Sequence, residues 1–170
     1  MLNGTSDKVP SPDAAITGYQ SAIDLWTFSS GQGWERFNIM LAANSILIAA
    51  LGLTHASDGP TVLFGLVLPL LGIVLSLIWY LLVRRSFDYA EYFTFIAREL
   101  EEAHFAPTVT TVARGAAFSR GDTIIFAFGS NRHSHRLSKP GRVIRARTAS
   151  YIVIVLFFVF YGLALCLYFN

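Results

Sequence analysis

Residues 61–83 read TVLFGLVLPLLGIVLSLIWYLLV, a run of 23 residues without a single Asp, Glu, Lys or Arg. As a helix this run is about 35 Å long, which is enough to cross a hydrocarbon core of about 30 Å. Residues 37–53 and 151–169 also lack charged residues. Apolar residues gathered into such runs are typical of an integral membrane protein. The sequence therefore predicts a membrane protein, mainly α-helical, with three transmembrane helices.

The basic residues indicate which side of the membrane each loop faces. Of the 13 Lys and Arg residues, 11 lie between Arg84 and Arg147, whereas residues 54–61 contain none. Loops rich in Lys and Arg stay in the cytoplasm. We therefore expect the N-terminus and residues 84–149 to be cytoplasmic. With three spans, the C-terminus then lies on the other side, which is the periplasm if the membrane is a bacterial inner membrane.

This reasoning divides the single domain into four segments. We predict an N-terminal cytoplasmic segment with an amphipathic helix (1–33) and a transmembrane hairpin (34–83) with spans 37–53 and 61–83. A cytoplasmic α+β layer (84–149) and the third transmembrane helix (150–170) follow. The tight turn of the hairpin is expected at Asp58-Gly59-Pro60.

Local signals predict the elements of the cytoplasmic segments. A helix is expected from Ser11, with Ser as the N-cap, to about Phe28, where the Ser29–Gly33 stretch ends it. The second span should continue as a helix to about His104, before Pro107.

Residues 108–128 are rich in β-branched and aromatic side chains, interrupted by glycines. They predict three short strands, at 108–112, 116–118 and 123–128, with a hairpin around Ser119–Asp122. Residues 130–147 are expected to be a basic loop with a turn at Pro140-Gly141. Three short strands bury little surface alone, so they need a further layer, either the helix over residues 86–104 or the same element of a neighbouring subunit. We favour a layer that packs between subunits.

Small and polar residues recur along the first span at steps of four and three. Transmembrane helices associate through close backbone approach at small residues and through polar hydrogen bonds. Asn44 lies off this stripe and is expected to meet a second neighbour, because an amide facing hydrocarbon is costly. The alternative is that Asn38 or Asn44 lines a polar path. The predicted oligomer-packing residues are Asn38, Ala42, Asn44, Ser45, Ala49 and Gly52.

Basic residues crowd both ends of the predicted cytoplasmic layer. Each such residue gains on the order of 1 kcal/mol from anionic headgroups at the cytoplasmic leaflet. We therefore favour contact with anionic lipid over binding of a phosphate ligand or of nucleic acid, for which no interleaved aromatic residues are present. The predicted lipid or anion contacts are Arg84, Arg85, Arg142, Arg145 and Arg147.

The sequence offers no catalytic constellation. His133 and His135 have a metal-like spacing, but no Cys, Asp or Glu lies within ten residues of them, so we interpret them as a solvated pair. There is no phosphate-binding glycine loop and no nucleophile elbow. We expect no enzyme activity, no cofactor and no metal.

Four stretches resemble a known family of small bacterial membrane proteins, the RipA family. They are WERFN (34–38), ANSIL (43–47), LPLLG (68–72) and ARELE (97–101), and the resemblance covers residues 34–102. The resemblance implies a cytoplasmic-membrane protein of unsettled molecular function that assembles as an octamer. It brings no functional site with it.

Two functions follow from these observations. The first is a homo-oligomeric bacterial inner-membrane assembly or scaffold protein without catalysis. The alternative is a channel or pore-forming membrane effector gated by a cytoplasmic ligand. A pore needs polar residues facing a common axis, and the first span offers only Asn38, Asn44 and Ser45.

Overall fold

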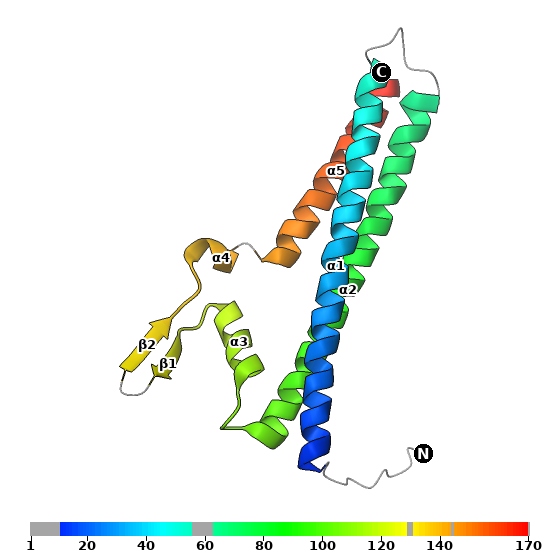
Figure 1. Cartoon of the computed structure of the whole chain (residues 1–170). Helices are drawn as coiled ribbons and strands as arrows, with labels where there is room; N and C mark the ends of the chain where they lie inside the picture. Colours follow the sequence, from blue (N-terminus) through cyan, green and yellow to red (C-terminus); the bar gives the residue numbers. More distant parts are fainter. Residues whose placement is uncertain (1–10, 56–62, 129–130, 144, 170) are drawn as a thin grey trace, which may run out of the picture. The chain divides into compact units, whose positions relative to one another are not determined.

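The computed structural model describes residues 11–55, 63–128, 131–143 and 145–169 (Figure 1). The turn predicted at residues 58–60 lies outside these residues. Two π-helical turns, Leu63–Val67 and Glu101–Phe105, precede and extend the second long helix. The remaining elements are α1 (Pro12–His55), α2 (Leu68–Leu100), α3 (Thr111–Arg120), β1 (Ile124–Phe128), β2 (Asn131–His135), α4 (Lys139–Val143) and α5 (Ala146–Phe169).

The predicted fold class is confirmed. Among the described residues, three helical stretches are long and apolar enough to cross a membrane: Pro12–Leu53, Gly65–Phe105 and Ala146–Phe169. The first two have 42 and 41 residues, which as helices are each about 60 Å long and exceed the hydrocarbon thickness about two-fold. The membrane-spanning parts are therefore the charge-free ones. The second helix continues without a break beyond Val83 and ends at Phe105, as predicted.

The chain forms two compact units. One contains the chain up to Phe28 together with Ala90–Arg142, and the other contains Ser29–Tyr89 and the chain from Val143 onward. The second unit is a bundle in which parts of α1, α2 and α5 lie side by side (Figure 1). We refer to these as the layer unit and the bundle unit.

Aromatic packing around Trp79 forms the core of the bundle unit. Trp79 of α2 has no exposed surface and lies 5.0 Å from Phe37 of α1 and 5.6 Å from Phe157 of α5, measured between ring centroids. Val83 and Ile154 complete the buried cluster. One large ring thus contacts all three helices of the bundle.

A polar contact in the charge-free part of the bundle also joins the three helices. The hydroxyl of Tyr161 on α5 donates a hydrogen bond to the backbone carbonyl of Asn44 on α1 at 3.0 Å. The hydroxyl of Ser76 on α2 donates to Oδ1 of Asn44 at 3.4 Å. The Asn44 amide donates to the carbonyl of Met40 at 2.8 Å. Asn44, Ser76 and Tyr161 have no exposed surface, so each polar group is satisfied inside the chain.

Two glycines allow the rings of α5 to pack directly on the second helix. A Cβ atom added at Gly72 would overlap the ring of Tyr161, and one added at Gly65 would overlap the ring of Tyr168. Both glycines are buried, and both pairs repeat after seven residues. Each tyrosine ring therefore occupies a place that only a residue without a side chain leaves open.

A buried carboxylate organises the layer unit. Glu101 is 1% exposed and accepts hydrogen bonds from the backbone N–H groups of Val112 at 2.8 Å and Ala113 at 2.9 Å. These are unpaired donors of the first turn of α3, so Glu101 serves as a distant N-terminal cap for that helix. The hydroxyl of Tyr19 on α1 donates to the same carboxylate at 2.8 Å. One side chain thus connects α1, the end of the second helix and α3.

The protonation of Glu101 follows from these contacts, which lie well beyond the charge-free part of the second helix. Burial alone would raise the pKa of Glu101, but the hydrogen bonds from Val112, Ala113 and Tyr19 outweigh burial and hold the pKa below its ordinary value of 4.5. Glu101 is therefore ionised at neutral pH, as a cap for the positive end of a helix should be.

The break predicted at Ser29–Gly33 is wrong. Helix α1 runs through this stretch without interruption. Ser and Gly have low helix propensity, but propensity is a weak prior that tertiary packing overrides. Here the packing is close, because a Cβ atom at Gly33 would lie 3.1 Å from Cβ of Ser86 on α2.

Most of the predicted strands are also wrong. Residues 111–120 form helix α3, and the antiparallel hairpin pairs β1 with β2, so that Ile124 faces His135 and Ala127 faces Arg132. The predicted basic loop instead contains β2, α4 and the start of α5. The reason is tertiary: Glu101 caps the start of α3, and Gly121, with φ of 95°, ends it.

We predict that Gly72→Ala destabilises the bundle unit, because the added methyl group displaces the ring of Tyr161. Overpacking of this kind costs about 1–3 kcal/mol. Thermal unfolding in detergent should show a lower midpoint. Gly162→Ala is the matched control, since a Cβ atom at Gly162 meets nothing within 4 Å. Equal midpoints for the two variants would contradict the packing role.

We predict that Glu101→Gln loosens α3, because an amide cannot accept from all the donors that now share the carboxylate. Leaving a buried donor unpaired costs about 1–3 kcal/mol. Hydrogen exchange of the peptide covering residues 111–120 should become faster, whereas the exposed neighbour change Glu102→Gln should leave it unchanged.

The pH dependence of this cap has a definite sign. The pKa of Glu101 is lowered on folding, so its contribution to stability is full above the ordinary value of 4.5 and is lost as the pH falls through the lower folded value. Protection of residues 111–120 that persisted unchanged through this acidic range would contradict the role of the carboxylate.

Candidate functional site at the membrane boundary

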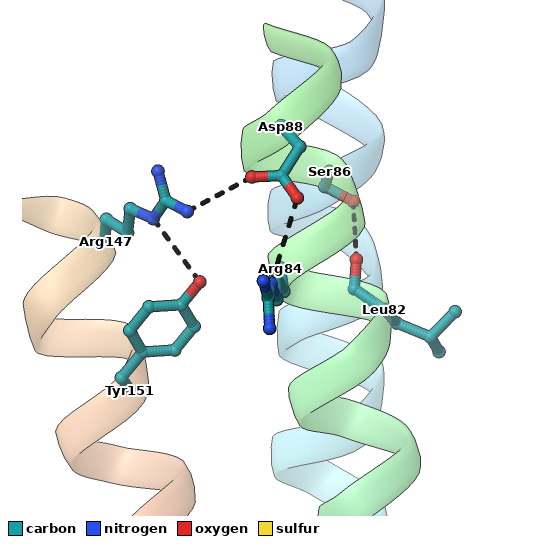
Figure 2. A network of polar contacts seen from close by, with 6 residues as sticks. All are labelled: Leu82, Arg84, Ser86, Asp88, Arg147 and Tyr151. Atoms are coloured by element: carbon teal, nitrogen blue, oxygen red, sulfur yellow. Dashed lines mark hydrogen bonds and ion pairs between the residues drawn. The ribbon is translucent and has the colours of Figure 1, made fainter. Parts of the chain in front are cut away.

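Charged residues meet where the charge-free parts of α2 and α5 end (Figure 2). The guanidinium of Arg147 on α5 donates a hydrogen bond to Oδ1 of Asp88 on α2 at 3.1 Å. Nε of Arg84, one turn before Asp88, lies 4.0 Å from its Oδ2. The carboxylate therefore contacts guanidinium groups from both helices and links α2 to the first turn of α5. We call Arg84, Asp88 and Arg147 the boundary cluster.

Aromatic rings surround the boundary cluster on its membrane side. Nε of Arg147 donates to the hydroxyl of Tyr151 at 3.4 Å, and the guanidinium lies 5.8 Å from the ring centre of Phe87. Tyr151 in turn lies 5.4 Å from Tyr80. Aromatic residues with a polar edge are enriched at the level of lipid headgroups. This ring set is therefore consistent with a headgroup-level position for the cluster.

The electrostatics of the boundary leave positive charge available. Asp88 contacts both Arg84 and Arg147, and all three side chains are at least 41% exposed. Nearby Arg85 donates to the hydroxyl of Tyr89 at 3.3 Å and lies over its ring. Guanidinium groups match phosphate groups in shape and charge, and binding of lipid phosphate at this boundary stays a prediction.

The structure separates the five basic residues that the sequence predicts as lipid contacts. Arg84 and Arg147 meet at Asp88, Arg85 rests on Tyr89, and Arg145 is exposed. Arg142 belongs to the layer unit, where its buried Nε has no hydrogen-bond partner among the described residues. Contact with lipid stays a prediction for all five.

The six predicted packing residues fall into two groups. Asn44 is fully buried and bonded inside the chain. The other five, which we call the small-residue stripe, are all exposed on the outer face of α1: Asn38, Ala42, Ser45, Ala49 and Gly52. Their role in contacts between chains stays a prediction, but the described part of the chain leaves all five exposed.

His135 of β2 is engaged in packing. The ring of His135 stacks on Phe118 of α3, with centroids 5.3 Å apart and planes 15° from parallel. In the part of the chain that the structure describes, no three His, Cys, Asp or Glu side chains come close enough to hold a metal ion.

Sequence reasoning missed Asp88, Tyr161 and Glu101. Asp88 has a local signal, because it lies four residues after Arg84 on one helix face. Tyr161 and Glu101 have none, because their partners are 117 and 82 residues away in Asn44 and Tyr19. Only the tertiary structure reveals these two contacts.

A family model described as the octameric membrane protein family (8xMP) matches residues 16–170. The chain belongs to the octameric membrane protein family. No curated protein and no solved structure matches it.

Membership in this family and the three candidate spans establish a multi-pass membrane protein. The description of the family as octameric also supports self-association of this chain into eight subunits. It specifies no molecular function. The match extends over α3, the hairpin and α5, beyond the residues 34–102 of the sequence resemblance.

We predict that Asp88→Asn strengthens binding of anionic lipid, because it removes the negative charge that contacts both Arg84 and Arg147. One unit of charge at a membrane surface is worth about 1 kcal/mol, or roughly five-fold in an association constant. The association constant of phosphatidylglycerol relative to phosphatidylcholine should rise up to that amount. Stability should change little, since exposed ion pairs contribute about 0–1 kcal/mol.

Asp24→Asn is the control for this measurement. It makes the same charge change at an exposed position of α1 in the layer unit. An equal rise in both variants would indicate a general charge effect, and no rise in either would contradict lipid contact at the boundary cluster.

Proposed function

We propose that this chain is a homo-oligomeric assembly or scaffold protein of a bacterial inner membrane, related to the RipA grouping and without catalytic activity. The observation that carries the proposal is the exposure of the entire small-residue stripe on α1 in a member of an octameric family. The eight subunits would meet through this face.

The physical argument rests on how helices associate in lipid. Lipid tails are as apolar as Leu side chains, so helices gain little by hiding apolar surface and associate instead through small residues and polar groups. Asn38 and Ser45 supply polar groups on the stripe, and Gly52 offers a Cβ position with nothing within 4 Å. A stripe of this kind, left exposed by its own chain, suits a neighbouring helix.

The absence of catalysis is proposed because the polar side chains with the most suggestive chemistry hold helices together. Glu101 caps α3 and accepts a hydrogen bond from Tyr19 of α1, and Asp88 pairs with arginines on two helices. Asn44, the residue on which a pore would most depend, bonds inside the chain. No observation favours the channel alternative.

We further propose the orientation and the lipid partner. The boundary cluster would face the cytoplasmic leaflet, so that the N-terminus and residues 84–149 are cytoplasmic and Asn170 is periplasmic. Positive charge on Arg84, Arg85 and Arg147 supports this orientation and a partnership with anionic headgroups. Nucleic acid is not an expected partner.

We predict that Ser45→Leu and Ala49→Leu each break the octamer, because a larger side chain keeps neighbouring helices apart. Mass measurement in detergent should show monomers or small oligomers where the parent protein shows eight subunits. Val159→Phe is the control, since it adds bulk at a half-exposed position of α5. An unchanged octamer in both stripe variants would refute the proposed contact face.

A further inference from the structure

The β-hairpin of the layer unit has one face turned toward α3 and one face turned away from it, which we call the uncovered face. Ile124, Phe126 and His135 line a cavity of about 330 Å³ against α3, and Arg114 of α3 lies 5.0 Å from the ring centre of Phe126. Side chains alternate between the faces of a strand, so the residues between these point away from α3. The uncovered face consists of Ile125, Ala127, Arg132 and Ser134, all exposed.

The uncovered face of this two-stranded sheet needs a packing partner. An isolated hairpin is at best marginally stable and needs a packed layer against it. Ile125 is 60% exposed, and Arg132 has no ion-pair partner among the described residues. A partner surface for this face must therefore offer an apolar contact next to negative charge.

A groove of the required chemistry lies on the same unit. It has a volume of about 510 Å³ and is lined by Phe95, Arg98, Glu99, Glu102 and Ala103. Phe95 is 55% exposed, and the two glutamates form no ion pair among the described residues. The groove thus joins an apolar surface to acidic side chains.

The segments that carry the hairpin face and the groove have opposite net charges. Residues 111–142 contain six Lys or Arg and one acidic residue, whereas residues 90–105 contain four Glu and one Arg. The hairpin face and the groove are both exposed in the single chain, so they do not cover one another within it. In an octamer a second copy of the chain presents a surface of each kind.

We propose that the uncovered hairpin face of one subunit packs into the α2 groove of the next subunit. Ile125 would lie against Phe95 and Ala103, and Arg132 would pair with Glu99 or Glu102. Because the two surfaces differ, the contact is head-to-tail and can repeat around a ring. The inference rests on the proposed self-association and adds to it a second contact, outside the membrane-spanning part.

Charge reversal tests the pairing. Arg132→Glu and Glu102→Arg alone should each lower the octameric fraction several-fold at moderate ionic strength, and the double variant should restore it. Lys139→Glu makes the same charge change outside the face and should have no effect. If the double variant is as impaired as the two single variants, or if Lys139→Glu acts equally, the pairing is wrong.

Crosslinking tests the contact without depending on stability. In a Cys166→Ser background, Ile125→Cys combined with Ala103→Cys and treated with a short bismaleimide should give a ladder of covalent multimers of up to eight chains. A mixture of the two single-cysteine chains should give covalent pairs only. Crosslinking only within one chain, or none in an intact octamer, would overturn this inference and leave self-association standing. Loss of the octamer in the parent protein would instead refute the proposed function.

Discussion

The contact of Asn44 with Ser76 and Tyr161 is the constraint on which the bundle depends. In hydrocarbon, polar groups have no water to bind, so each must find a partner in the protein. The Tyr161 hydroxyl meets a carbonyl of α1 while its ring rests on Gly72 of α2, and Ser76 reaches the Asn44 side chain. Three helices are thus joined where hydrophobic burial contributes little, and the Trp79 cluster packs the same helices together.

The sequence predicted what depends on composition and missed what depends on partners. Charge-free runs identify spanning helices, because lipid forbids charges along a whole segment. The interior position of Asn44 follows from the same cost. Helix α3 could not be foreseen, since Thr111 and Val112 favour strands locally and become helical where Glu101 caps them from another helix. The helix through Gly33 depends similarly on packing against Ser86.

The candidate site shows the same division. Positive residues at the ends of spans were readable from the sequence, because their distribution obeys a membrane rule. The contact of Asp88 with both Arg84 and Arg147 is visible only in the tertiary structure. The carboxylate offsets part of the positive charge that the arginines bring to this boundary. The layer unit depends on a different kind of contact, a buried carboxylate that accepts hydrogen bonds from the first turn of helix α3.

The pairing of Gly65 with Tyr168 and Gly72 with Tyr161 has a consequence for motion. Each ring fills a notch, and the two notches are seven residues apart on both partners. A shift of α5 along α2 by one helical turn would drive both rings against larger side chains. These two contacts therefore oppose translation of α5 along the axis of α2. A force from the membrane or a neighbouring subunit that moves this part of α2 should move α5 with it.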